Sequence, residues 1–177
     1  MNQLDLSSGD WIAVSSGFIA LIALVTTLWQ AHLMRTHNFL SSRPVLDIDS
    51  LSRPDVTIGL IIRNCGPGPA FISAATATFR KTTYSLTSAR DFKEFIAALV
   101  HAGLPCNKFS VSVANTESVI APGHTFELLL IVEKDNRDHI GQAFSALMHE
   151  VRIEVAYNSL YARKYKALYD SPIVSCI

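Results

Sequence analysis

Residues 63 to 72 read RNCGPGPAFI and combine a cysteine, two glycines and two prolines between two apolar runs. Such a stretch suits a phosphate-cradling loop, a reactive thiol or a plain turn. A phosphate loop binds oxygens through backbone N–H groups. Pro67 and Pro69 have no N–H, no Lys-Ser/Thr pair follows, and Phe71 interrupts the G-x-G-x-x-G pattern. The stretch is therefore unsuited to holding a phosphate.

As a connection between two strands, the same stretch is easily explained. Asn64 and Gly66 can adopt positive φ, and the two prolines stiffen the link. The predicted structural turn comprises Asn64, Gly66, Pro67, Gly68 and Pro69.

Cys65 would be reactive only if a positive charge stabilised its thiolate and a base stood nearby. Arg63 lies two residues away, but the sequence does not place the histidines at positions 101, 124, 139 and 149 relative to this thiol. No serine lies in a G-x-S-x-G motif. We therefore expect no catalytic residue and classify the chain as a non-enzyme.

Asp47 and Asp49 share one face of a predicted strand and form a candidate pair of ligands for a divalent cation. No third oxygen ligand is adjacent, so a solvated strand face is the simpler interpretation. The motifs H-x-x-x-H and C-x-x-C are absent as well. We predict neither a metal site nor a cofactor.

The stretch VAYNSLYARKYKALYD, residues 155–170, spaces tyrosines four residues apart among basic residues. We expect a β-hairpin with Ala162 and Arg163 near its bend, although a helix would also align the tyrosines. Such a pattern suits an interface or a base-stacking platform, and cross-strand tyrosine pairs beside exposed basic residues explain it equally. The candidate recognition surface comprises Tyr157, Tyr161, Arg163, Lys164, Tyr165 and Tyr169.

The composition of the chain gives no global charge signal, but its hydropathy points to a membrane. The formal net charge is zero and the pI is about 7.0, so no global charge attracts nucleic acid or an anionic membrane surface. The mean hydropathy of +0.27 is high for a soluble protein, and the excess comes from the uncharged residues 11–29. A helix of this length spans about 28 Å, close to the hydrocarbon core of a bilayer. Trp11 and Trp29 bracket it, as interfacial anchors do.

A buried core helix or a cleaved signal peptide would share these features. The rest of the chain has few long apolar helices that could surround a core helix. A signal peptide begins with basic residues, whereas the first ten residues here contain Asp5 and Asp10 and neither Lys nor Arg. We expect an uncleaved, single-pass transmembrane helix.

The charges that flank the span predict its orientation. Arg35 and Arg43 follow it, and the positive-inside rule then places the N-terminus outside and residues 33–177 in the cytoplasm, at the inner (cell) membrane. Three scattered cysteines, at positions 65, 106 and 176, agree with a reducing compartment.

Small residues on one side of the span predict a face on which two helices could approach closely. This candidate helix–helix face comprises Ala13, Ser16, Gly17 and Ala20, and it indicates self-association of the span.

From residue 45 the chain consists of strand-length runs rich in β-branched residues, separated by Gly, Pro, Asn and Ser. We expect about seven strands and two short helices, at residues 88–103 and 136–150. The fold class is thus mainly β (α+β): an N-terminal transmembrane helix followed by an immunoglobulin-like antiparallel β-sandwich with two helical insertions. The expected divisions are an external tail (1–10), the helix with its cytoplasmic extension (11–40), a linker (41–44) and the β-rich domain (45–177).

The layout resembles that of small, uncharacterised bacterial single-pass proteins with a cytoplasmic β-sandwich. The resemblance covers most of the chain and lies in five features: the uncharged span, the "R-P" that follows it, "I-x-N-x-G-x-G-P-A", "I-x-P-G" at residues 120–123, and "V-x-Y-x-x-x-Y-x-x-K-Y" near the end. It implies a fold and a location and carries no activity.

These observations favour a membrane-anchored, non-enzymatic interaction or sensor module that binds a protein or small ligand at the membrane. The alternative is an effector of the defence or toxin type, whose helix oligomerises and perturbs the bilayer. Ser15, Ser16, Thr26 and Thr27 are the polar positions of the span that allow this second idea. A membrane-bound enzyme is the third interpretation, and no spacing of nucleophiles, acids or histidines supports it.

Overall fold

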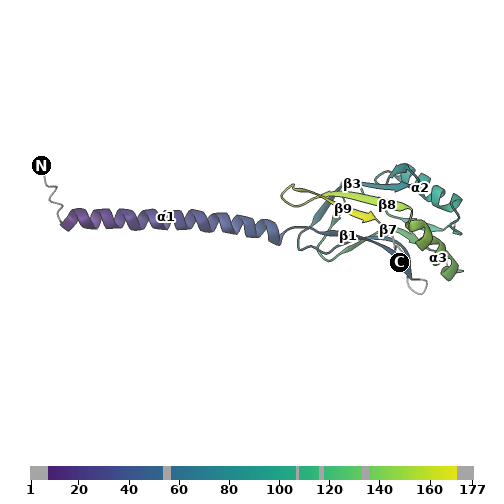
Figure 1. The fold of residues 1–177 in the computed structure, drawn as a ribbon, viewed down its shortest axis with the longest axis horizontal. Coiled ribbons are helices and arrows are strands. Elements are labelled where there is room, and N and C mark those ends of the chain that lie inside the picture. The colour runs from purple at the N-terminus through teal and green to yellow at the C-terminus, as the bar shows by residue number, and fades with distance from the viewer. Residues whose placement is uncertain (1–7, 54–56, 107, 116–117, 133–135, 171–177) are drawn as a thin grey trace, which may run out of the picture. The chain divides into compact units, whose positions relative to one another are not determined.

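The computed structural model describes residues 8–53, 57–106, 108–115, 118–132 and 136–170. Most of the predicted external tail and Cys176 lie outside these ranges. The chain divides between Ser41 and Ser42 into two compact units, a helical one and a β-rich one (Figure 1).

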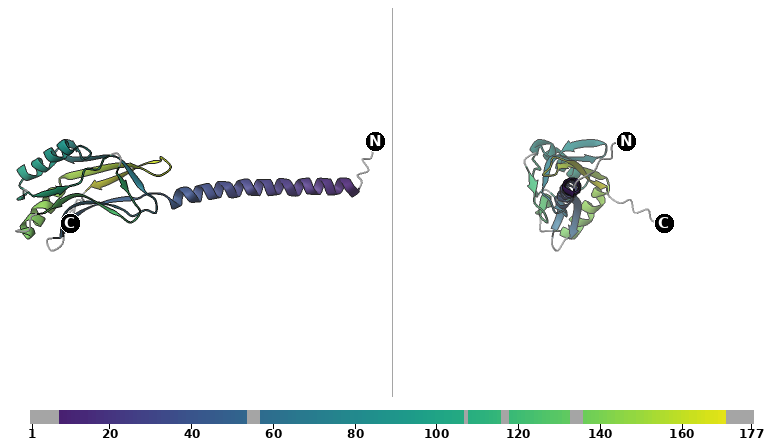
Figure 2. Two further views of the ribbon diagram at one scale, coloured as in Figure 1. Left: turned by 180° about the vertical axis from the view of Figure 1, so that it is seen from behind. Right: turned by 90° about the vertical axis from the view of Figure 1, so that its left-hand side faces the viewer.

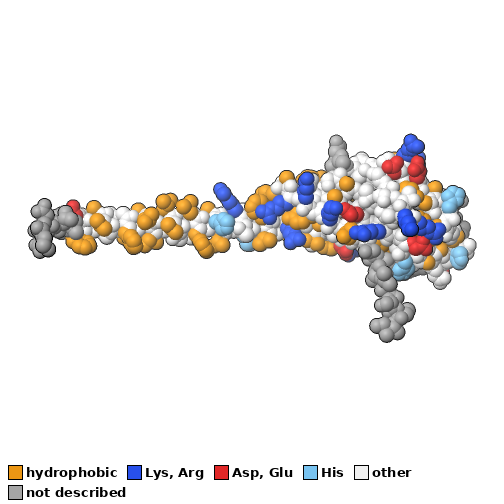
Figure 3. All heavy atoms as spheres, turned by 45° about the horizontal axis from the view of Figure 1, so that its top comes forward, with side chains coloured by type: hydrophobic (Ala, Val, Ile, Leu, Met, Phe, Trp, Pro, Cys, Tyr) orange, Lys and Arg blue, Asp and Glu red, His pale blue; other side chains and the backbone are white. Residues whose placement is uncertain are grey.

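The first unit is the helix α1 (Ser8–Ser41). From Gly9 to Ser41 it is long and apolar enough to cross a membrane, and none of its most apolar stretch is buried against the rest of the described chain. Exposed apolar side chains occur along its whole length, from Trp11 to Leu40, and Figure 3 shows those on one side of it. A helix that is apolar on all sides is stable only where something apolar surrounds it, and a bilayer is one such environment.

The hydroxyl groups of the span bond to the helix's own backbone. Ser15 and Ser16 donate to carbonyls three residues back, at 3.0 and 2.9 Å. Thr26 and Thr27 donate to carbonyls four residues back, at 2.8 and 2.7 Å. Each hydroxyl therefore has an acceptor within α1, which lowers the cost of placing it in lipid.

The second unit is α+β and contains two antiparallel sheets. The first has the strand order β1-β2-β7-β5, and the second has the order β4-β3-β8-β9, with β6 paired to β3. Their bounds are β1 (Leu46–Arg53), β2 (Thr57–Asn64), β3 (Ala70–Phe79), β4 (Thr82–Ser85), β5 (Phe109–Val111), β6 (Val119–Ile120), β7 (Thr125–Ile131), β8 (Val151–Asn158) and β9 (Lys164–Asp170). The two helices are α2 (Ala89–His101) and α3 (Arg137–Met148).

The two sheets share one hydrophobic core. Along β8, residues 151, 153, 155 and 157 are buried and the residues between them are not, which is the alternation of a half-buried strand. α2 packs against β4, whereas α3 contacts β1, β2 and β8 and so touches both sheets. The edge strands β1 and β9 lie close to each other, but they belong to different sheets.

Both predicted helices are present, with the expected apolar faces. Ser88 caps α2 by accepting a hydrogen bond from the backbone N–H of Asp91, as its position before the apolar run suggests. Phe92, Phe95 and Leu99 of α2 are buried, and α3 buries Ile140, Phe144, Leu147 and Met148.

The described residues form nine strands, two more than predicted. The additional strands are β4 and β6. β4 follows a two-residue turn at Arg80 and Lys81, which have φ values of 47° and 70°. Turns of this kind usually contain Asn-Gly. Because Arg-Lys stands here instead, the sequence did not indicate a hairpin at this point. β6 has only two residues, too few for a periodic pattern.

The turn after β2 does not use the positive φ that Asn64 and Gly66 could adopt. Among the described residues, neither Asn64 nor Gly66 has positive φ. Glycine is needed here because the loop is pressed against the first residues of the unit. A Cβ on Gly66 would lie 2.4 Å from the Val45 nitrogen, and one on Gly68 would lie 1.8 Å from the Ser42 carbonyl oxygen.

Asn64 is fully buried and uses both ends of its side-chain amide. Its Oδ1 accepts hydrogen bonds from the backbone N–H groups of Val45 (3.3 Å) and Gly66 (3.0 Å). Its Nδ2 donates to the carbonyls of Gly68 (2.8 Å) and Ile120 (2.9 Å). The side chain thereby joins three parts of the unit: the segment before β1, the loop of residues 66–69, and β6.

Replacement of Asn64 by alanine should strongly destabilise the β-rich unit. It removes four hydrogen bonds and leaves two N–H groups and two carbonyls short of partners. At about 1–3 kcal/mol for each buried group left unsatisfied, and with partial relaxation, we expect a loss of roughly 3 kcal/mol or more. Urea unfolding of the full-length chain in mild detergent measures this. Asn115→Ala, at an exposed position, is the matched control and should change little; equal effects of the two variants would refute the argument.

Candidate functional site

The predicted recognition surface lies on the hairpin of β8 and β9. The register places Tyr157 opposite Tyr165 and Asn158 opposite Lys164. Ala162 closes the turn with φ of 56°, near the bend that the sequence indicates. Figure 1 shows this hairpin in yellow and yellow-green.

The structure divides the six predicted residues among three environments. Tyr157 is buried, and Tyr165 and Tyr169 are half-buried against the core. Lys164 is exposed and lies on the opposite face of β9 from its neighbour Tyr165. Tyr161 and Arg163 are exposed in the turn. The tyrosines therefore do not form one open stacking platform.

Tyrosine side chains connect β9 and β8 with the start of the unit. The rings of Tyr157 and Tyr165 stack with centroids 5.6 Å apart, and the guanidinium of Arg43 lies 5.3 Å from the centroid of Tyr165. The Tyr157 hydroxyl accepts a hydrogen bond from the backbone N–H of Leu46 at 3.3 Å. Tyr169 and Ser50 hydroxyls are 2.8 Å apart. These contacts explain why the tyrosines recur along the two strands.

The outer side of the same strands contains an open pocket of about 550 Å³. It is lined by Ser73, Ala156, Tyr157, Asn158, Lys164, Tyr165 and Lys166. This volume lies within the usual range for small-ligand sites.

A bulge and a small residue shape this pocket. The pairing of β3 with β8 shifts between Ile72 and Ala74, which leaves Ser73 without a partner in the register. Bulges of this kind redirect a side chain. Ala156 lies on β8, between Ser73 of β3 and the lysines of β9, and its small side chain leaves space between them. Sequence reasoning missed Ser73, Ala156 and Asn158 because no motif marks them; an alanine facing out among larger residues is their only signal.

The two lysines of the pocket differ in electrostatic environment. Lys166 forms an ion pair with Glu154 at 2.5 Å, whereas Lys164 makes no ion pair within the described part of the chain. The hydrogen bond from Lys166 lowers the pKa of Glu154 below its usual value; the positive charges of Lys166 and Arg152 act in the same direction, and desolvation opposes them. Lys164 thus supplies the uncompensated positive charge of the pocket.

The other candidate groups are separate from this pocket. Asp47 and Asp49 are exposed on β1, with Arg63 directly across from Asp47, and the described residues contain no cluster of three metal-ligating side chains. Cys65 is exposed and follows the buried Asn64 in the chain, and Cys106 is buried. Gly17, on the predicted helix–helix face with Ala13, Ser16 and Ala20, has open space around its Cα.

Comparison with known proteins identifies a family without an assigned activity. A family model described as a domain of unknown function, DUF8453, matches residues 10–171, so it covers almost all of both units. No curated protein matches the chain significantly.

The pair of Lys166 and Glu154 should make the unit less stable in acid. A carboxyl whose pKa is lowered on folding adds stability above its unfolded pKa, and this contribution is lost as the pH falls through the folded value. In Lys166→Gln, the pKa of Glu154 should rise toward its ordinary value, as measured by carbon-detected NMR titration in detergent. Arg90→Gln, which removes the exposed pair with Glu94, is the control and should leave Glu154 unchanged. An unchanged Glu154 titration in Lys166→Gln would contradict the assignment.

Proposed function

The chain belongs to the DUF8453 family, and we propose that it is a membrane-anchored, non-enzymatic interaction or sensor module. In this proposal α1 spans the inner membrane once, and the β-rich unit lies in the cytoplasm and is an immunoglobulin-like sandwich. The unit binds a protein or small ligand that carries an acidic group. The observation that carries the proposal is the open pocket on β3, β8 and β9, with Lys164 at its wall.

The anchor part of the proposal is supported by the properties of α1. Its apolar stretch is unburied within the described chain, and its serine and threonine hydroxyls bond internally. The family match begins at residue 10, so the helix is part of what the family shares. The family match is the observation that supports a retained helix over a leader that is removed.

The binding part is supported by the shape and charge of the pocket. A concave surface with a few polar groups is the usual form of a small-ligand site, and an unpaired lysine favours an anionic group. Ser73 and Asn158 add a hydroxyl and an amide for orientation. We propose no reaction at this pocket.

The competing proposal, an oligomerising effector, depends on the small residues of α1. Ser15, Ser16, Thr26 and Thr27 have acceptors within their own helix, so none of them requires a second helix. The face around Gly17 permits close approach but does not call for it. We therefore place the interaction module first.

Labelling of cysteine tests the orientation. Cys65 is exposed and Cys106 is buried, so in a Cys176→Ser chain only Cys65 should react. A membrane-impermeant maleimide should leave intact cells unlabelled and should modify the chain once after permeabilisation. Labelling of intact cells would reverse the proposed topology.

Site-specific photocrosslinking in cells tests the pocket. A benzoylphenylalanine in place of Asn158 should give a discrete adduct, whose mass distinguishes a small ligand from a protein. The same residue in place of Thr83, exposed on β4 outside the pocket, is the control and should give none. Lys164→Glu should reduce the adduct several-fold, because it replaces an attractive charge with a repulsive one. Equal adducts at both positions, or no effect of Lys164→Glu, would contradict the proposal.

A further inference from the structure

One end of the β-rich unit is formed by four segments that we call the basal loops: residues 42–46, 64–70, 118–125 and 158–164. Asn64 bonds to Val45, Gly68 and Ile120, which joins the first three of these segments. Arg43 stacks over Tyr165, at the base of the hairpin, and brings in the fourth. In Figure 1 and in the left view of Figure 2, the tip of the yellow hairpin and the first residues of the unit lie at the same end.

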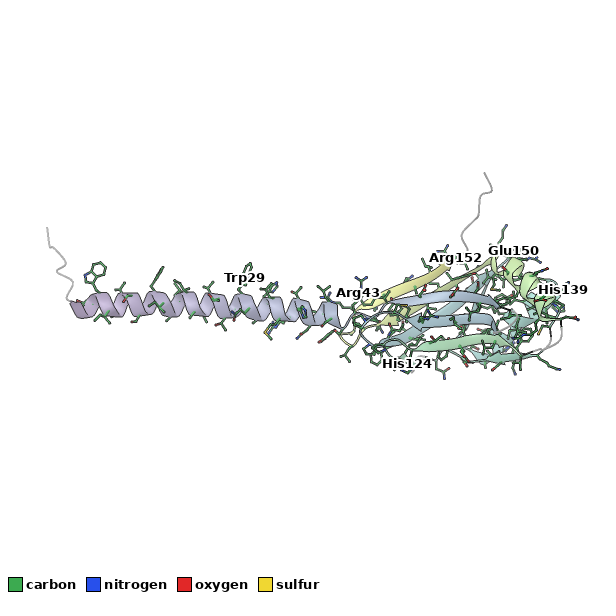
Figure 4. All side chains as sticks on the ribbon, turned by 90° about the horizontal axis from the view of Figure 1, so that it is seen from below. Trp29, Arg43, His124, His139, Glu150 and Arg152 are labelled. Carbon is green, nitrogen blue, oxygen red and sulfur yellow. The ribbon has the colours of Figure 1, made fainter. Side chains whose placement is uncertain are left out.

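The basal loops carry positive charge and no acidic residue. Their basic residues are Arg43, Arg163 and Lys164, and none of the four segments contains Asp or Glu. Elsewhere in the unit, acidic and basic residues are mixed, as on α2 and beside Glu150. Figure 3 shows basic side chains beside hydrophobic ones at this end, and Figure 4 places Arg43 there and His139 at the opposite end.

The same loops expose apolar side chains. Val45, Val119, Leu160 and Tyr161 are 44, 51, 60 and 44% exposed, respectively. Leu160 and Tyr161 form the tip of the hairpin, between Ser159 and Ala162. Apolar residues at a projecting tip, with basic residues beside them, are the composition of a surface that enters the headgroup layer of an anionic membrane.

The tip holds its shape through hydrogen bonds. Ser159 is buried; its backbone N–H donates to the Arg163 carbonyl at 2.9 Å, and its carbonyl accepts from the Ala162 N–H at 2.9 Å. Its hydroxyl accepts from the Arg163 N–H at 3.3 Å. Leu160 and Tyr161 are therefore presented at little further cost in conformational entropy.

The length of the chain permits contact with lipid. If residues 11–29 fill the hydrocarbon core, the twelve residues from 30 to 41 extend about 18 Å beyond it as a helix. The headgroup layer occupies roughly 5–7 Å of this, which leaves about 12 Å. Because residue 42 directly follows the helix, the chain itself keeps the first residues of the β-rich unit within about this distance of the headgroup layer.

We propose that the basal loops dock on anionic phospholipid headgroups of the membrane that α1 spans, with Leu160 and Tyr161 entering the interface and Arg43 and Arg163 contacting phosphates. The inference goes beyond the proposed pocket and rests on the proposed function only in requiring α1 to span the bilayer. Docking would hold the pocket of β3, β8 and β9 close to the membrane surface.

Tryptophan fluorescence in nanodiscs with brominated lipids tests both points separately. Quenching of the native Trp11 and Trp29 reports whether α1 is inserted. In a chain with Trp11→Phe and Trp29→Phe, Leu160→Trp then reports docking, and His139→Trp is the control at the opposite end of the unit.

In nanodiscs of brominated phosphatidylcholine with phosphatidylglycerol, we expect the lipid to quench the tryptophan fluorescence of the Leu160→Trp chain. The fluorescence of the His139→Trp chain should stay unquenched. Adding Arg163→Gln should lower the docked fraction relative to the undocked one about fivefold, the ratio that one basic residue supplies near an anionic surface, whereas Arg163→Lys should preserve it. Quenched native tryptophans without quenching of Leu160→Trp would overturn the docking proposal alone. Equal quenching of Leu160→Trp in pure phosphatidylcholine would overturn it as well. Unquenched native tryptophans would overturn the anchor and, with it, the proposed function.

Discussion

The side chain of Asn64 holds together segments of the β-rich unit that are far apart in sequence. It bonds to backbone groups of residues 45, 66, 68 and 120, while its own backbone bonds to residues 123 and 124. The amide suits this position because it presents two acceptor sites and two donors in one plane. Glycine at positions 66 and 68 is a further consequence, since the loop must approach residues 42–45 more closely than any side chain permits.

A second layer of contacts depends on that arrangement. Once residues 43–46 are held in place, Arg43 and the Leu46 N–H meet the tyrosines of β8 and β9. The inner side of the hairpin is thereby attached to β1, and its outer side is left for Ser73, Ala156 and the two lysines. Residues that stabilise and residues that face solvent alternate along the same two strands, as the pleat requires.

Much of this fold could be predicted from the sequence, and the exceptions have physical causes. Helical periodicity and a serine cap are local signals, so α2 and α3 were predicted closely, as was the long apolar helix. The turn at Arg80 and Lys81 was missed because its positive φ values belong to a tight link between paired strands and are not marked by Asn or Gly. For the candidate site, the tyrosines and lysines were visible in the sequence, but which of them face the core depends on contacts with β1. The pocket itself depends on a bulge, which arises from pairing between strands that lie some eighty residues apart.

The contact between β1 and β9 also determines when the unit can fold during synthesis. β1 is the first strand of the described residues and β9 the last, so the contact between the Ser50 and Tyr169 hydroxyls, which joins the two sheets, forms only after β9 has been made. Until β9 has been made, the edge of β8 that it covers is unpaired, and such an edge can pair with other chains.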